Sequence, residues 1–217
     1  MKTPDNERRQ IGAGRQPAGS SAFNRMERMP PRLLMLYMGL LGISVLFIGL
    51  VALYVLTRLQ HGGGPSGHAF PRYFSLSTIV LLTSSAVVAQ ARRLYQADDL
   101  PNLARCLAAT LLLGSIFCGL QLAGWHELVL QKVLFTADPS GSFVYVISGV
   151  HIAHIVGGML YLLVLLLRTL HATRDSVRTL VFIRNPYHRR QLQAISTYWY
   201  FVDAVWVVLF MVFLFMY

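Results

Sequence analysis

The chain has 217 residues, of which 55% are apolar and only 13% charged, and its formal net charge is +10. Soluble domains carry about 25% charged residues, so this composition excludes an ordinary water-soluble domain and favours a protein that lies in lipid. The excess of positive charge is explained below by membrane topology, which leaves no need for a nucleic-acid partner.

The first 32 residues are polar and basic, with Pro, Gly and Ser throughout. They lack the apolar segment of a signal peptide. We therefore expect two parts, a disordered basic cytoplasmic tail at 1–32 and a membrane domain at 33–217.

Five segments of the second part are apolar, nearly free of charge and close to the ~20 residues that a helix needs to cross a bilayer. Their ranges are 33–56, 73–91, 103–124, 143–167 and 192–217. Lipid offers backbone groups no hydrogen-bond partner, so such segments form helices, and the alternation typical of a β-barrel is missing. The predicted fold class is all-α, a polytopic bundle of five transmembrane helices.

The 19 Lys and Arg residues predict the orientation of these helices. Seven lie in the tail, three in the loop between the second and third helices, and six in the loop between the fourth and fifth. Only Arg58, Arg72 and Lys132 lie on the other side. We therefore expect the N-terminus on the cytoplasmic side of the membrane and the C-terminus on the opposite side, with the arginines facing anionic lipid.

The second and third segments contain polar side chains at membrane depth. The stretch "TSSAVVAQ", 83–90, is rich in small and hydroxyl residues and favours hydrogen bonds between helices. Cys106 and Cys118 are twelve residues apart on one helix and are poor disulfide candidates. The end of the third segment is expected to place Gln121, His126 and Glu127 at the outer interface.

The fourth segment carries His151 and His154, three residues apart and therefore on nearly one helical face. Gly149, Ala153 and Gly157 follow a four-residue spacing, which predicts a close approach by another helix beside His154. The histidines either pack between helices or handle protons, and the sequence leaves both readings open.

The fifth segment holds Asp203 among aromatic residues. At 1.5 Å per residue Asp203 lies roughly 15 Å from Gln193, and His154 lies roughly 20 Å from Leu167, so both fall near one level if the two helices are neighbours. An ionisable residue at this depth is a functional candidate, although a hydrogen-bonded aspartate also serves as an interhelical contact.

Cofactor sites are poorly supplied by these residues. Two histidines on one helical face cannot bind opposite sides of a haem, and no thiol or carboxylate joins them on that helix to hold copper or zinc. Phosphate loops, nucleophile elbows and CxxC or HExxH patterns do not occur in the sequence. We expect no active site and no bound cofactor in this chain.

Three segments resemble subunit III of the haem–copper oxidases, the cytochrome c oxidase subunit 3 family. "STYWYFVDAVWVVLF" is similar to the family's last-helix signature Tyr-Trp-His-Phe-Val-Asp-Val-Val-Trp. "GVHIAHIVGG" resembles its His-Gly-Leu-His segment, and "LLLGSIFCGLQLAGWHELV" resembles the Leu-Gln-aromatic stretch of an earlier helix. The match runs from about Leu33 to Tyr217 and implies the short, five-helix bacterial form, which lies in the bacterial inner membrane with its C-terminus on the periplasmic side.

The resemblance singles out a set of buried polar and packing residues: Gln121, Glu127, His151, His154, Tyr200, Asp203 and Trp206. The chain departs from the family pattern at three places. Tyr200 stands where the family usually has histidine, and Gly124 stands where many members have glutamate. The first segment also lacks the family's Ser-Glu pair, which weakens any transfer of lipid or proton effects residue by residue.

The resemblance implies an accessory, non-redox subunit of a respiratory terminal oxidase. Haem and copper are then expected in partner subunits I and II, and structural phospholipids around this chain. The implied roles are assembly, lipid binding and support of proton uptake by subunit I during oxygen reduction. A larger respiratory supercomplex is a further partner to consider, and nucleic acid is not one.

Three alternatives stay open at this point. Within the family, the chain suits a quinol oxidase or the related subunit that accompanies nitric oxide reductase. A more distant alternative is a small proton channel or transporter that uses Asp203, His151 and His154 as a relay. On the inner side, six arginines are candidate contacts for anionic lipid or a partner, or serve topology alone: Arg168, Arg174, Arg178, Arg184, Arg189 and Arg190.

Overall fold

A computed structural model of the chain describes residues 31–60, 71–131, 139–174 and 186–216, with 179 and 184 as isolated positions. Its contacts divide the chain into two units, Met1–Gly39 and Leu40–Tyr217. The described part of the first unit, 31–39, is the start of a helix. The predicted tail at 1–32 lies almost wholly outside the described residues.

The described ranges contain five long helices and no strand, which confirms the predicted all-α membrane fold. The helices are α2 (Pro31–Gln60), α3 (Arg72–Gln96), α4 (Leu100–Leu130), α5 (Pro139–Ala172) and α7 (Pro186–Met216). All five are long and apolar enough to cross a membrane. The shortest, α3, has 25 residues and so spans about 38 Å at 1.5 Å per residue.

Each helix is longer than the apolar segment from which it was predicted, because the polar residues next to that segment are helical as well. The helix predicted at 103–124 begins at Leu100 and ends at Leu130, and the one predicted at 192–217 begins at Pro186. The predicted orientation in the membrane stays a prediction.

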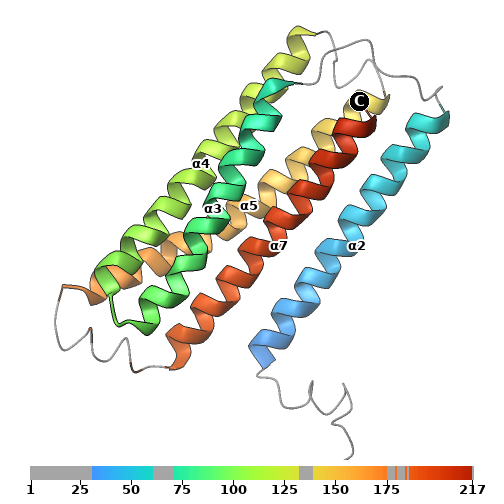
Figure 1. Cartoon of the computed structure of the whole chain (residues 1–217). Helices are drawn as coiled ribbons and strands as arrows, with labels where there is room; N and C mark the ends of the chain where they lie inside the picture. Colours follow the sequence, from blue (N-terminus) through green and yellow to red (C-terminus); the bar gives the residue numbers. More distant parts are fainter. Residues whose placement is uncertain are drawn as a thin grey trace, which may run out of the picture. The chain divides into compact units, whose positions relative to one another are not determined.

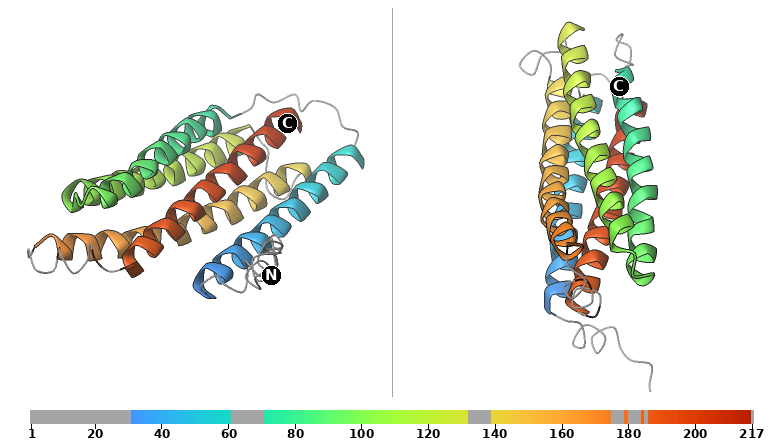
Figure 2. Two further views of the ribbon diagram at one scale, coloured as in Figure 1. Left: turned by 60° about the horizontal axis from the view of Figure 1, so that its bottom comes forward. Right: turned by 90° about the vertical axis from the view of Figure 1, so that its left-hand side faces the viewer.

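Four helices of the second unit form a closed bundle (Figure 1). α3 packs against α4 and α7, and α5 packs against the same two helices. The views in Figure 2 show α3 and α4 side by side along their length. This arrangement brings the first third of the membrane domain against its last helix, 118 residues away in sequence at the Ser85–Asp203 contact.

The tight α3–α4 turn is set by two aspartates. Asp98 has a φ of 57°, a left-handed conformation that aspartate tolerates better than most residues. Asp99 caps α4, since its Oδ1 accepts from the Asn102 backbone N–H at 3.1 Å, and Pro101 follows within the first turn. The turn makes α3 and α4 antiparallel neighbours.

Within the second unit α2 contacts the bundle along a single stripe. Leu40, Phe47 and Tyr54 are its buried residues, and they recur every seven positions. The Tyr54 ring lies 6.3 Å from Phe143 of α5 and 5.9 Å from Phe213 of α7, measured between centroids. Among the described residues of the second unit, this narrow stripe is therefore the covered part of α2.

Candidate functional site

One face of α3 supplies hydroxyl groups to the neighbouring helices. Ser77 accepts from the Gln121 amide of α4 at 2.9 Å, and Thr78 accepts from the Trp206 indole of α7 at 3.0 Å. One to two turns further on, Ser84 accepts from the Trp199 indole at 3.0 Å, and Ser85 donates to Asp203. The prediction that the stretch 83–90 forms hydrogen bonds between helices is confirmed.

Asp203 lies on the face of α7 that packs against α3. It is 4% exposed, and its Oδ2 accepts from the Ser85 hydroxyl. Its Oδ1 is buried and has no hydrogen-bond partner among the described residues. A carboxyl placed here holds α3 and α7 together through one hydroxyl while a second acceptor position stays unused.

His151 lies in the centre of the bundle and is 0% exposed. Its ring stacks on Trp206 with 5.0 Å between centroids, and the edges of Phe47 and Phe117 meet it at 5.9 and 6.0 Å. Neither ring nitrogen has a hydrogen-bond partner among the described residues. The imidazole is thus packed as one member of an aromatic cluster drawn from α2, α4, α5 and α7.

His154 is half-buried and makes a local contact instead. Its Nδ1 lies 2.8 Å from the Val150 carbonyl one turn earlier, so this nitrogen carries the proton and donates. The His154 backbone carbonyl accepts from the Tyr198 hydroxyl of α7 at 2.9 Å. Only the Tyr198 bond joins α5 to α7, because the Val150 bond lies within α5.

The structure does not assemble the relay that Asp203, His151 and His154 suggested. α5 and α7 are neighbours, as that idea required, but Asp203 points to α3. No described hydrogen bond or ring contact joins Asp203 to either histidine. The rotation of α7 about its axis directs the carboxyl toward Ser85 of α3.

Two further expectations are corrected. Among the described residues, the predicted close approach along Gly149, Ala153 and Gly157 is limited to Gly149, whose Cβ position lies 3.7 Å from the Trp125 ring of α4. Ala153 and Gly157 are exposed, and a Cβ built at Gly157 has no described atom of another helix within 4 Å. The neighbouring Gly158 carries the contact with α7 instead, and the Tyr198 ring lies 2.8 Å from its Cβ position.

Gln121 also lies in a different environment from the one expected. It is fully buried inside the bundle rather than at the outer interface, because α4 continues nine residues beyond it. Glu127 does lie near the helix end, where its Oε2 accepts from the Arg72 backbone N–H at 3.0 Å. The carboxylate thereby satisfies a first-turn donor of α3, whose own preceding residue, Pro71, provides no side-chain cap.

Two of the three departures from the family pattern, at Tyr200 and Gly124, can be explained by their surroundings in the structure. Tyr200 is 42% exposed on the outside of α7, so the replacement of histidine meets no packing barrier. At Gly124, the Phe74 ring of α3 fills the place of a side chain, with Cε1 only 2.6 Å from a Cβ built there. A glutamate at 124 is therefore incompatible with Phe74 in its present position.

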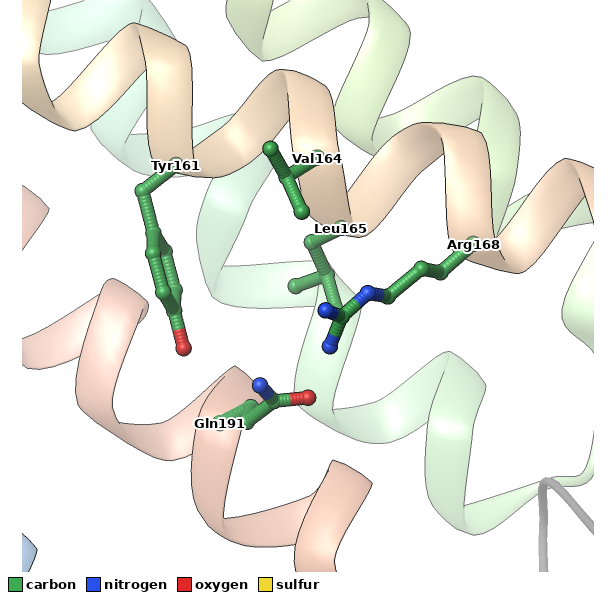
Figure 3. A pocket seen from close by; sticks show the side chains of 5 residues that line it. All are labelled: Tyr161, Val164, Leu165, Arg168 and Gln191. Atoms are coloured by element: carbon green, nitrogen blue, oxygen red, sulfur yellow. The ribbon is translucent and has the colours of Figure 1, made fainter.

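One recess lies between α5 and α7 near the end that carries the arginines. It has a volume of about 50 Å³ and opens to the surface. Figure 3 shows the Arg168 guanidinium, the Gln191 amide and the Tyr161 hydroxyl directed toward one space, with Val164 and Leu165 as its apolar wall. Of the other arginines, the described ones, Arg174, Arg184, Arg189 and Arg190, are exposed, and Arg178 lies outside the described residues.

Sequence reasoning missed several contacts of this interior. The Trp199–Ser84 bond and the Trp125–Ser148 bond, both 3.0 Å, each join a tryptophan to a serine of another helix. Their signal is the indole N–H, which needs an acceptor at membrane depth. Phe47 and Phe117 carry no such signal, because many phenylalanines pack in helical interiors.

The structure also describes the two cysteines and the possible metal ligands. Cys106 and Cys118 are both free thiols, as predicted, and Cys106 donates to the Val87 carbonyl at 3.0 Å. In the ranges that the structure describes, no three His, Cys, Asp or Glu side chains gather as a metal site would require.

Comparison with known proteins agrees with the motifs. Residues 71–217 match the family described as cytochrome c oxidase subunit III. The cytochrome c oxidase subunit 3 of Bacillus sp. (strain PS3) is 32% identical over 174 residues, which is 79% of each chain. The protein of the same name from Corynebacterium diphtheriae is 30% identical over 169 residues, 76% of this chain and 78% of its own.

A probable cytochrome c oxidase subunit 3 from Nocardia farcinica is 29% identical over 167 residues, 76% of this chain and 77% of its own. The family match includes the Ser77–Ser85 face of α3, the α5 histidines and the aspartate of α7. The chain belongs to the cytochrome c oxidase subunit III family and is a multi-pass membrane subunit of a multi-subunit oxidase complex.

Proposed function

We propose that this chain is an accessory subunit of a bacterial inner-membrane terminal oxidase, packed beside subunits I and II, which hold the haem and copper. One observation carries the proposal: the polar side chains of the bundle are used for contacts between its own helices. Ser77, Thr78, Ser84 and Ser85 are each bonded to another helix, and His151 is enclosed by aromatic rings. Such an interior suits a structural subunit whose work is to hold its neighbours and lipids in place.

The proposed contribution to proton uptake is indirect. The buried acid accepts from Ser85, and no described hydrogen bond joins it to either histidine, so the described residues favour support of subunit I over a proton path of this chain's own. Electron donor and haem type belong to other chains, and both a cytochrome c oxidase and a quinol oxidase are compatible with these residues.

Purification through a tag on this chain in mild detergent tests the proposal. We expect a haem- and copper-containing subunit I to copurify at a fixed ratio, with the visible spectrum of the oxidase. The isolated chain is expected to be colourless and to carry no protons across the membrane of liposomes. A colourless chain that comes without partners and carries protons would overturn the proposal, as would haem bound to the isolated chain.

We further propose that the α5–α7 recess binds the phosphate of an anionic lipid. A guanidinium donates to phosphate oxygens in a bidentate manner, Gln191 and Tyr161 add hydrogen-bonding groups, and Val164 and Leu165 present an apolar wall to an acyl chain. Exposed arginines nearby add an attractive potential for anionic headgroups.

Changing Arg168 to glutamine should lower the amount of anionic lipid that stays bound to the purified complex. Because the change removes charge and the bidentate donor together, we expect about one phosphatidylglycerol fewer per complex by mass spectrometry of extracted lipid. The control Arg190→Gln removes an exposed arginine of the same side without touching the recess. Equal lipid loss in the two variants would show a diffuse electrostatic effect and contradict a site.

A further inference from the structure

His151 is a polar side chain enclosed by apolar neighbours. It is 0% exposed, and neither ring nitrogen has a hydrogen-bond partner among the described residues. It lies roughly 18 Å along α5 from Pro139, well inside a hydrocarbon core of about 30 Å. A neutral imidazole has one N–H donor and one acceptor, and leaving both unbonded in an apolar interior costs free energy. The ring would therefore bind water or a proton if either reached it.

Aromatic rings of α4 and α7 cover two sides of His151. Trp206 of α7 stacks on it at 5.0 Å between centroids, and Phe117 of α4 lies at 6.0 Å. Trp206 is itself held by its hydrogen bond to Thr78 and by the edge of Phe117 at 5.2 Å. This part of the cover belongs to the closed four-helix bundle.

The cover from α2 is the ring of Phe47. Its centroid lies 5.9 Å from the His151 ring and 5.6 Å from the His154 ring, and Phe47 is only 4% exposed. The buried residues of α2 are Phe47 and, seven positions away on either side, Leu40 and Tyr54. Phe47 is therefore the described contact of α2 that shields both imidazoles.

The space that the Phe47 ring fills determines whether water reaches the histidines. A cavity with apolar walls stays dry, whereas a roomy cavity with hydrogen-bonding groups on its wall takes up water. Without this ring, His151 would line such a cavity with its unbonded imidazole, and the half-buried His154 lies beside it. Water there would bring protons to imidazole, the side chain that titrates near neutral pH.

We propose that His151 is a latent proton-binding site that Phe47 of α2 keeps closed. The phenyl ring excludes water, so that His151 stays neutral at a depth where a hydrated imidazole would be a step for protons crossing the bilayer. The described ring contacts of His151 are all aromatic, and His154 is its titratable neighbour on α5. This role of α2 goes beyond that of an accessory subunit and does not depend on which partners the chain contacts.

Hydrogen–deuterium exchange at the histidine rings, measured by mass spectrometry of the full chain in lipid nanodiscs, tests the closed site. The ring Cε1 hydrogen exchanges when a protonated imidazole is in contact with water, so each histidine reports its own access to water and protons. In the unchanged protein we expect slow exchange at His151 and fast exchange at the exposed His126. Phe47→Ala should speed exchange at His151 by roughly tenfold or more, because exchange follows the population of open states.

Tyr54→Ala is the matched control, because it removes an aromatic ring from the same stripe of α2. The described ring contacts of Tyr54 are Phe143 and Phe213, so the wall of the space that it leaves is apolar on these sides and exchange at His151 should stay slow. Slow exchange at His151 in Phe47→Ala, or an equal rise in Tyr54→Ala, would overturn the proposal.

A milder pair of variants decides the matter if Phe47→Ala does not fold, as judged by its helix content. Phe47→Val opens a smaller space and should still raise exchange at His151 above the rate in Tyr54→Val. Phe47→Leu keeps more of the apolar volume and should raise it less than Phe47→Val. An unchanged rate at His151 in Phe47→Val would contradict the closed site.

Discussion

Changing Trp206 to alanine is expected to lower the free energy of unfolding of this chain by about 3–5 kcal/mol, the cost of removing a buried aromatic ring. The Trp206 ring is fully buried and joins four helices. It stacks on His151 of α5, lies 5.2 Å from Phe117 of α4 between centroids, and donates to Thr78 of α3 at 3.0 Å. Loss of the ring therefore opens the centre of the bundle.

The measurement is detergent-driven unfolding of the purified chain, followed by helix content, together with retention of the chain in the oxidase complex. Val208→Ala is the control, because it shortens an exposed side chain on the same helix. Trp206→Phe separates the ring from the N–H and should cost clearly less than alanine, although it leaves Thr78 without its donor. If Trp206→Ala unfolds like Val208→Ala, the central role of this ring is wrong.

Adding a single methyl group at Gly124 is expected to destabilise the chain by about 1–3 kcal/mol, the usual cost of overpacking. A Cβ at this position would lie 2.6 and 2.8 Å from two atoms of the Phe74 ring. Phe74 is itself fully buried and lies against Trp206 with 6.3 Å between centroids, so the ring has little room to retreat. The same argument predicts a larger loss for Gly124→Glu, which adds a carboxyl to the clash.

Gly119→Ala provides a matched control on the same helix, since nothing lies within 4 Å of its Cβ position. That change should be neutral or stabilising by up to about 1 kcal/mol, because alanine favours helix over glycine. The second variant, Gly124→Ala with Phe74→Leu, tests the cause. It should recover part of the stability lost in Gly124→Ala, and failure to recover any would show that Phe74 is not the obstacle.

The two histidines show what the spacing of residues along a helix can and cannot predict. Their separation of three residues correctly placed them on neighbouring positions of one helix. At 100° per residue they are still about 60° apart around the axis. That difference puts His151 among Phe47, Phe117 and Trp206, whereas His154 stays half-buried and bonds its own helix.

Small residues give a similar lesson. The four-residue spacing of Gly149, Ala153 and Gly157 resembled a packing surface, yet the contact with α7 is made at Gly158, one position further around the helix. A small residue permits close approach but does not determine where the neighbouring helix lies. The direction of that helix follows from the large side chains, here Tyr198 and Trp199.

The sequence by itself determined the five membrane helices, the hydroxyl-rich stretch of α3 and the family signature around Asp203. Each of these is a property of a single segment, because it depends only on the length of that segment, its apolar content and the order of its residues. Only the tertiary structure decided that Asp203 meets Ser85 rather than a histidine, and that Phe74 occupies the space beside Gly124. The physical reason is that the rotation of each helix about its axis results from packing against all its neighbours at once, and no single segment contains that information.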